Sequence, residues 1–147
     1  MNYLAHLALS QDDPLIMLGN FIADDVPRKE EVQLSPEIVN GIILHRRIDE
    51  FTDAHPAFRE AMIKLRPKHR KYAPVVLDIL NDHLLANNWG QFYSVSRSDF
   101  DNNVYKAFRP LVRQLPPKAS MHVEALLEYE YLAAYDSRKG IDLCFRT

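Results

Sequence analysis

Apolar residues recur every three or four positions along most of the chain, which is the spacing of one buried helix face. Two helix starts are marked by a short polar residue before a proline, at Asp13-Pro14 and Ser35-Pro36. The other prolines fall mostly between periodic segments, and no Asn-Gly or Asp-Gly turn sits between alternating strands. The pattern therefore predicts an all-α chain, folded as a single-domain bundle of about six or seven helices.

The positions of the capping residues and prolines also predict where each helix begins and ends. We expect helices over residues 2–9, from Pro14 towards Asp24, from Pro36 to about His55, between Pro56 and Pro67, from about Ala73 to Trp89, from a Ser98-Asp99 cap to Gln114, and from about Lys118 to Tyr135. The charged stretch over residues 26–34 is expected to be a loop. The tail after Ser137 carries only a weak pattern.

Size and composition place the chain among ordinary globular domains. It has 147 residues, of which 47% are hydrophobic and 26% charged, enough to bury a core. The net charge of −2 gives no general attraction to nucleic acid or to an anionic membrane. A single cysteine, Cys144, excludes an intrachain disulfide, and no apolar stretch is long enough to span a bilayer. We expect a soluble, cytoplasmic protein with neither a membrane nor a nucleic-acid partner.

Polar side chains recur four residues apart on four of the expected helices, so that each set lies on one helix face. These sets are Asn2 and His6; Asn20 and Asp24; His45, Asp49 and Asp53; and Asp78 and Asp82, followed directly by His83. A single such pair is more commonly a solvated helix face. Four pairs within apolar sequence favour a metal site at the centre of a bundle, because buried carboxylates are costly unless paired or coordinated. Nitrogen and oxygen donors suit manganese, magnesium, iron or zinc.

A basic cluster follows the third set, in the segment KLRPKHRK over residues 64–71. Such a run is either a solvated surface or a docking patch for an acidic protein or for phosphate. Arg46 and Arg47 are adjacent to His45 and are candidates for contacting a phosphate through two parallel hydrogen bonds. The sequence has no glycine-rich phosphate loop and no G-x-S-x-G nucleophile motif, and Cys144 has no obvious base beside it.

Four blocks carry a family resemblance. They lie between Met1 and Trp89 and read MNYLAHLALS, GNFIADDV, GIILHRRIDEFTD and LDILNDHLLANNW. In their order and spacing this chain resembles the acyl carrier protein phosphodiesterase family. From Gly90 onwards only the helical character matches, and we expect the C-terminal part of the family pattern to be missing. The resemblance implies a helical, HD-domain-like fold, usually manganese-dependent, with Mg²⁺ or Fe²⁺ as alternatives.

The implied reaction is hydrolysis of the phosphodiester that links 4′-phosphopantetheine to a serine of holo acyl carrier protein. The products are the apo carrier and free 4′-phosphopantetheine. Two alternatives are a carrier-binding module without turnover and a phosphohydrolase for a small nucleotide-like phosphodiester.

The resemblance also implies roles for particular residues. Metal ligands are expected among His6, Asp24, His45, Asp78, Asp82 and His83. Catalytic roles are expected for Asp24, Asp82, Asp49, which would orient His45, and Arg46, which would stabilise charge on the phosphate. Carrier proteins of this type are acidic, so docking is expected at Lys64, Arg66, Lys68, Arg70 and Lys71. The adjoining pair reads Asp82-His83, the reverse of the superfamily's His-Asp order.

Overall fold

The structure, a computed structural model, describes residues 3–145, and all regular secondary structure within that range is helical. The α-helices are α1 (Tyr3–Ala8), α2 (Pro14–Ile22), α3 (Pro36–Ala54), α4 (Pro56–His69), α5 (Ala73–Asn87), α6 (Arg97–Phe108), α7 (Pro117–Tyr129) and α8 (Arg138–Cys144). Short 3-10 helices are η1 (Ala23–Asp25), η2 (Arg28–Gln33), η3 (Arg70–Tyr72), η4 (Trp89–Gln91), η5 (Arg109–Gln114) and η6 (Tyr131–Asp136). The all-α prediction is confirmed.

Side-chain caps start several helices where the sequence predicts them. Asp13 accepts hydrogen bonds from the N–H groups of Leu15 and Ile16, and the Ser35 side chain accepts from Ile38. Each cap satisfies backbone donors that have no partner within the helix. The predicted cap at Ser98-Asp99 is wrong by two residues: the hydroxyl of Ser96 accepts from the N–H of Asp99.

The predicted ends differ more from the structure. The segment expected as a loop holds η2, and α4 continues through the exposed Pro67, where the missing N–H removes one helical hydrogen bond. The last long helix, α7, stops before Glu130, which adopts a left-handed conformation with φ of 45°. The chain then continues as η6 and α8. The weakly patterned tail is therefore ordered as a helix, capped by the Ser137 side chain.

Two glycines allow α2 and α3 to pack with their backbones in contact. A Cβ atom on Gly19 would lie 1.9 Å from the carbonyl oxygen of Ile38, and one on Gly41 would lie 2.2 Å from that of Ile16. No other residue type fits at either position without moving a helix. This contact brings Asn20 of α2 beside His45 of α3.

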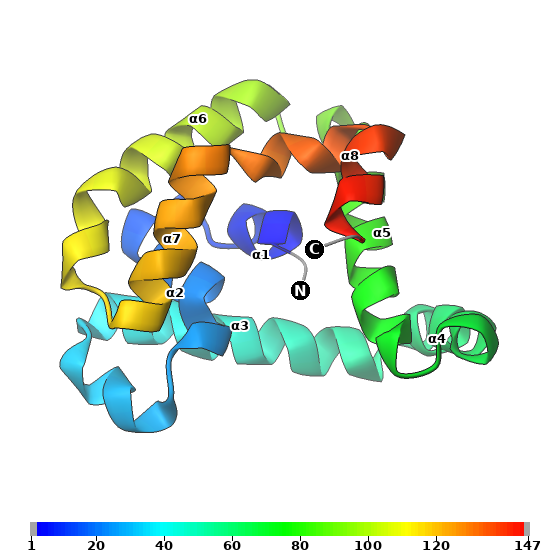
Figure 1. Ribbon diagram of the computed structural model, residues 1–147, viewed down its shortest axis with the longest axis horizontal. Helices are drawn as coiled ribbons and strands as arrows, with labels where there is room; N and C mark the ends of the chain where they lie inside the picture. Colours follow the sequence, from blue (N-terminus) through cyan, green and yellow to red (C-terminus); the bar gives the residue numbers. More distant parts are fainter. Residues whose placement is uncertain (1–2, 146–147) are drawn as a thin grey trace.

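The core surrounds α1, which lies near the centre of the molecule with α3, α5 and α7 around it (Figure 1). Its fully buried side chains include Leu4, Leu18, Ile42, Phe108 and Leu126. A smaller apolar cluster joins α4 to the first half of α5, and α4 lies at the edge of the molecule. Among the described helices, none has both the length and the apolar character needed to cross a membrane.

Candidate metal centre

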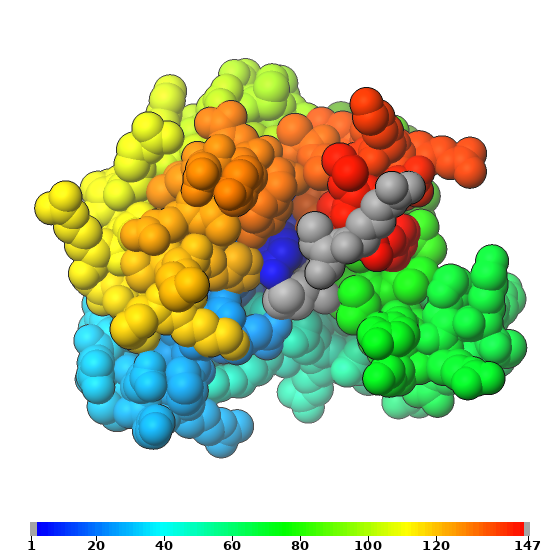
Figure 2. All heavy atoms as spheres, viewed as in Figure 1, coloured from blue at the N-terminus to red at the C-terminus, as the bar shows by residue number. Residues whose placement is uncertain are grey.

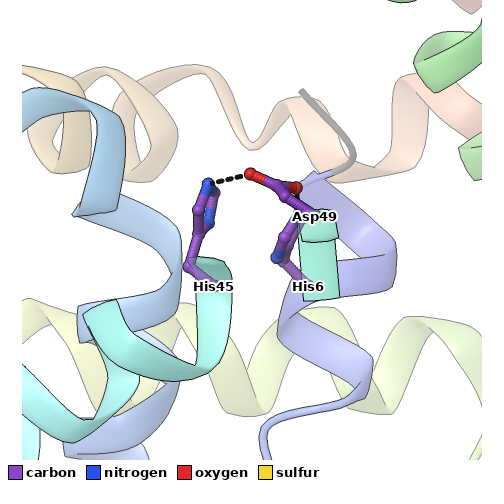
Figure 3. Close-up of side chains that lie close together, drawn as sticks. All are labelled: His6, His45 and Asp49. Carbon is purple, nitrogen blue, oxygen red and sulfur yellow. Dashed lines mark ion pairs between the residues drawn. The ribbon is translucent and has the colours of Figure 1, made fainter. Parts of the chain in front are cut away.

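Two buried histidines from different helices meet one carboxylate that is exposed to solvent. His6 of α1 and His45 of α3 stack with ring centroids 4.1 Å apart and ring planes 18° apart. The Nε2 atom of each ring lies 3.2 Å from a carboxylate oxygen of Asp49, one turn beyond His45 (Figure 3). The possible ligand atoms of these three residues all lie within 4.8 Å of one another. Asp24 adds a fourth donor, with Oδ1 3.6 Å from His45 Nε2.

A single buried residue, Asn20, sets the orientation of both rings. Its side-chain Oδ1 lies 2.7 Å from His6 Nδ1, and its backbone oxygen lies 2.8 Å from His45 Nδ1. The Asn20 amide nitrogen donates to the backbone oxygen of His6 and to Ser10 Oγ, which fixes which end of the amide faces His6. Because an oxygen of this kind can only accept, each Nδ1 carries a proton and each Nε2 faces the carboxylates. Metal-binding histidines are held in this way.

The charges of the cluster favour a cation between the rings and the carboxylates. Burial alone would lower the pKa of His45, but hydrogen bonds and charge from Asp24 and Asp49 raise it to about 9. Burial alone would raise the pKa of Asp49, but His45 and His6 hold it well below its ordinary value. The pKa of Asp24 is lowered, chiefly by its hydrogen bond to His45. These carboxylates are therefore ionised at neutral pH.

The donor set fits one divalent ion. Bonds of about 2.1 Å to nitrogen and oxygen place neighbouring ligand atoms roughly 3 Å apart, close to the separations from Asp49 to the two rings. The surrounding pocket has a volume of about 240 Å³ and is also lined by Thr52, Asp53, Phe58, Pro74 and Asp78. Burial raises the pKa of Asp78, which lies on α5 across the pocket. Of the predicted ligands, the structure brings His6, Asp24, His45 and Asp78 together.

Asp82 lies outside this pocket. It is fully buried, and its two oxygens accept hydrogen bonds from the N–H groups of Leu4 and Ala5, each at 3.0 Å. Burial raises the pKa of Asp82 to about 7, although the two N–H groups oppose that shift. Asp82 thus ties α5 to the first turn of α1, the short helix that carries His6.

His83 and Arg46 are also turned away from the pocket. Consecutive helical residues point about 100° apart, so His83 faces a different side of α5 from Asp82. Its Nδ1 lies 2.6 Å from the backbone oxygen of Tyr135 in η6. The Arg46 guanidinium pairs with Glu31 of η2 and does not line the pocket. Asn2, which the sequence pairs with His6, lies outside the described residues.

The basic cluster lies at the end of α4 and in η3, where all five of its lysines and arginines are exposed. A groove of about 520 Å³ connects it to the metal pocket. Arg66 lines this groove, and Asp53, Phe58 and Pro74 line both the groove and the pocket.

The sequence does not reveal that Asn20 holds both rings, since the contact to His45 uses its backbone oxygen. The available signal is the position of Asn20, an amide between apolar residues one turn before Asp24. The direct approach of Asp49 to His6 likewise depends on how α1 and α3 pack, which residue spacing within one helix cannot give.

Comparisons with known proteins agree on one family. A family model described as acyl carrier protein phosphodiesterase matches residues 1–147. The chain is 45% identical over 89 residues to an acyl carrier protein phosphodiesterase of Yersinia enterocolitica, covering 60% of this chain and 46% of that protein. It is 37% identical over 119 residues to one of Serratia proteamaculans, covering 80% of this chain and 62% of that protein. No solved structure matches. The chain spans about half to three fifths of the length of these relatives.

Proposed function

Because this chain belongs to the acyl carrier protein phosphodiesterase family, we propose that it hydrolyses the phosphodiester between 4′-phosphopantetheine and the serine of holo acyl carrier protein. The observation that carries the proposal is the convergence of His6, His45 and Asp49, with both rings held by Asn20. We further propose manganese as the metal and the cytoplasm as the compartment.

In this proposal His6, His45, Asp49 and Asp24 hold the ion. A bound divalent ion neutralises charge on the phosphate and lowers the pKa of a water molecule. Asn20 holds a proton on Nδ1 of each imidazole and so directs Nε2 towards the ion, and Asp82 holds α1 so that His6 stays in place. Asp82, His83 and Arg46 have no direct contact with the ion in this scheme.

Asp78 is the proposed proton acceptor. Its carboxyl lines the pocket and has a raised pKa, which makes it a better base than an ordinary aspartate. Water attacks phosphorus, and Asp78 accepts a proton from it. The bond from phosphorus to the serine oxygen breaks, and the serine oxygen takes up that proton. The products are the serine hydroxyl of the apo carrier and 4′-phosphopantetheine.

The basic cluster is the proposed docking surface for the acidic carrier. Complementary charge there raises the rate of encounter and orients the partner. The groove lined by Arg66 and Phe58 joins the cluster to the pocket, so a carrier docked on α4 has its serine beside the metal ligands.

The reaction is tested by the intact mass of holo acyl carrier protein after incubation with this chain and Mn²⁺. We expect loss of the 4′-phosphopantetheine mass, abolished by EDTA and by His45→Ala, and retained in the surface control Asp142→Ala. An unchanged mass with Mn²⁺ present would exclude turnover of the carrier. Salt-sensitive binding of the carrier without turnover would then favour the binding module, whereas turnover of a small phosphodiester alone would favour the third alternative.

A further inference from the structure

A second recess lies between α1, α5, α7, η6 and α8 and is larger than the metal pocket. Its volume is about 700 Å³, and its walls are mostly aromatic and aliphatic, including Tyr3, Ile79, Tyr131, Tyr135 and Leu143. Figure 2 shows part of α1 at the bottom of a hollow between α7 and the C-terminal helices. A recess of this size and lining suits a small, largely apolar ligand.

One wall of the recess carries a chain of hydrogen bonds. His122 of α7 bonds through Nδ1 to the carboxylate of Asp25, whose other oxygen lies 3.0 Å from Lys118 Nζ. The Nε2 atom of the same ring lies 3.0 Å from the hydroxyl oxygen of Tyr131. Asp25 and His122 are both largely buried.

This chain of bonds determines what the Tyr131 hydroxyl can offer to a ligand. The Asp25 carboxylate accepts, so Nδ1 of His122 carries a proton. In the tautomer with its proton on Nδ1, Nε2 of His122 accepts the proton of the Tyr131 hydroxyl. Burial raises the pKa of Tyr131, which keeps that hydroxyl protonated. With its proton used in this way, the Tyr131 oxygen presents lone pairs to the recess. It therefore suits an N–H donor.

The recess adjoins the metal pocket through shared elements. On α5, Pro74 and Asp78 line the pocket, whereas Val75 and Ile79 line the recess. In η1, Asp24 contacts His45 in the pocket, and the next residue, Asp25, contacts His122 at the recess. The recess and the pocket share no lining residue, but they lie on neighbouring faces of the same helix, α5.

We propose that this recess binds the pantetheine arm of the substrate and that the Tyr131 oxygen, held by His122 and Asp25, accepts a hydrogen bond from an amide N–H of the arm. The inference rests on the proposed function. The arm combines a geminal dimethyl group with two amides, which matches apolar walls containing one oriented acceptor. Tyr131 is a binding residue in this scheme, and His122 and Asp25 are positioning residues.

Binding can be measured without catalysis. The probe is N-ethylpantothenamide, which carries both amides and the dimethyl group but neither phosphate nor thiol. Cys144 is the only cysteine of the chain and lines the recess, so bound probe should slow its alkylation, followed by mass spectrometry. Tyr131→Phe should weaken probe binding about 3- to 10-fold, the effect of one neutral hydrogen bond. Tyr93→Phe is the control, since it loses a hydroxyl bond, to Ala8, outside the recess.

A second variant covers the case in which Tyr131→Phe does not fold. Val75 is 49% exposed at the edge of the recess, so Val75→Trp should fold and fill it, abolishing protection of Cys144 by the probe. The inference is overturned if the probe neither binds nor slows alkylation in the parent chain. It is also overturned if folded Tyr131→Phe, or Val75→Trp, binds the probe as tightly as the parent.

Catalytic measurements separate this inference from the proposed function. With Mn²⁺, Tyr131→Phe should raise KM for holo carrier about 3- to 10-fold and leave hydrolysis of bis(4-nitrophenyl) phosphate, which has no pantetheine arm, unchanged. An equal loss of activity of Tyr131→Phe on both substrates would contradict a role of Tyr131 in binding the arm. If the parent chain hydrolyses neither substrate, the proposed function fails, and the Cys144 protection experiment still decides whether the recess binds the arm.

Discussion

At the scale of single residues, the site depends on an amide that contributes no ligand. Asn20 is fully buried and contacts both histidines, one through its side chain and one through its backbone. The sequence indicates the histidines and aspartates by their spacing, because residues four apart share a helix face. It cannot indicate which face of His6 meets His45, since that depends on how two helices cross.

The first prediction concerns Asn20. Asn20→Ala removes the acceptor of His6 Nδ1 and frees that ring to rotate, so Mn²⁺ affinity should fall about 10- to 100-fold. Isothermal titration calorimetry on the folded variant measures this, with the exposed Asn103→Ala as the control. Unchanged affinity in Asn20→Ala would show that the ring needs no support from this amide.

The second prediction concerns pH and His45. Its folded-state pKa of about 9 lies above the ordinary value of about 6.5. In the metal-free protein, the stability gained from the protonated ring is therefore fully present below pH 6.5 and is lost as pH rises through 9. Mn²⁺ must displace that proton, so its affinity should keep rising up to roughly tenfold per pH unit between pH 6.5 and 9. A competition titration at pH 6.5, 7.5 and 8.5 measures this, and a plateau above 7.5 would contradict it.

At the scale of elements, two short contacts place the helices that carry the site. The α2–α3 crossing depends on Gly19 and Gly41, and the start of α1 depends on Asp82. Caps and prolines in the sequence predict the starts of α2 and α3 correctly, because capping is local. The ends of α6 and α7 and the existence of α8 are not predicted, because packing rather than local sequence determines them.

The third prediction concerns the crossing of α2 and α3. Gly41→Ala places a methyl group against the backbone of Ile16, so the free energy of unfolding should fall by at least about 1–3 kcal/mol. Gly90→Ala is the control, because nothing lies within 4 Å of its added Cβ, and it should change stability by less than about 0.5 kcal/mol. Urea denaturation measures the free energy of unfolding of both variants and of the parent chain. Equal stabilities would show that the two helices separate freely.

The fourth prediction separates anchoring by Asp82 from metal binding. Asp82→Ala leaves the N–H groups of Leu4 and Ala5 buried without acceptors, which should cost about 1–3 kcal/mol of stability per group. Asp82→Asn retains one acceptor, so its stability should lie between those of the parent chain and of Asp82→Ala. Folded Asp82→Asn should still bind one Mn²⁺. Complete loss of Mn²⁺ binding at unchanged stability would instead make Asp82 a ligand.

At the scale of the whole molecule, the chain brings a metal pocket, a basic surface and an apolar recess together around α1 and α5. The sequence predicts the first two as separate features, through polar pairs and a charge run. Their connection arises because α4 begins directly after α3, so that Asp53 and Phe58, on either side of the junction, line both the pocket and the groove. The recess has no local sequence signal, since its walls combine α1 and α5 with the C-terminal part of the chain from α7 to α8.

The fifth prediction concerns the basic surface. Reversing Arg66, Lys68 and Lys71 to glutamate should raise KM for holo carrier at least tenfold at low salt, because encounter with an acidic partner loses its attraction. Hydrolysis of bis(4-nitrophenyl) phosphate should not change. The control reverses the exposed Lys106, Arg109 and Arg113 instead, with the same change in net charge. Equal effects from the two triple variants would refute docking at this surface.

The central claim is that His6 and His45 bind one ion together. Electron spin echo envelope modulation of the Mn²⁺-loaded protein measures this directly, because each bound imidazole nitrogen modulates the echo. We expect one tightly bound Mn²⁺ per chain coupled to two imidazole nitrogens, and to one in His6→Gln. A spectrum of Mn²⁺ coupled to fewer than two imidazole nitrogens in the parent chain would contradict the claim.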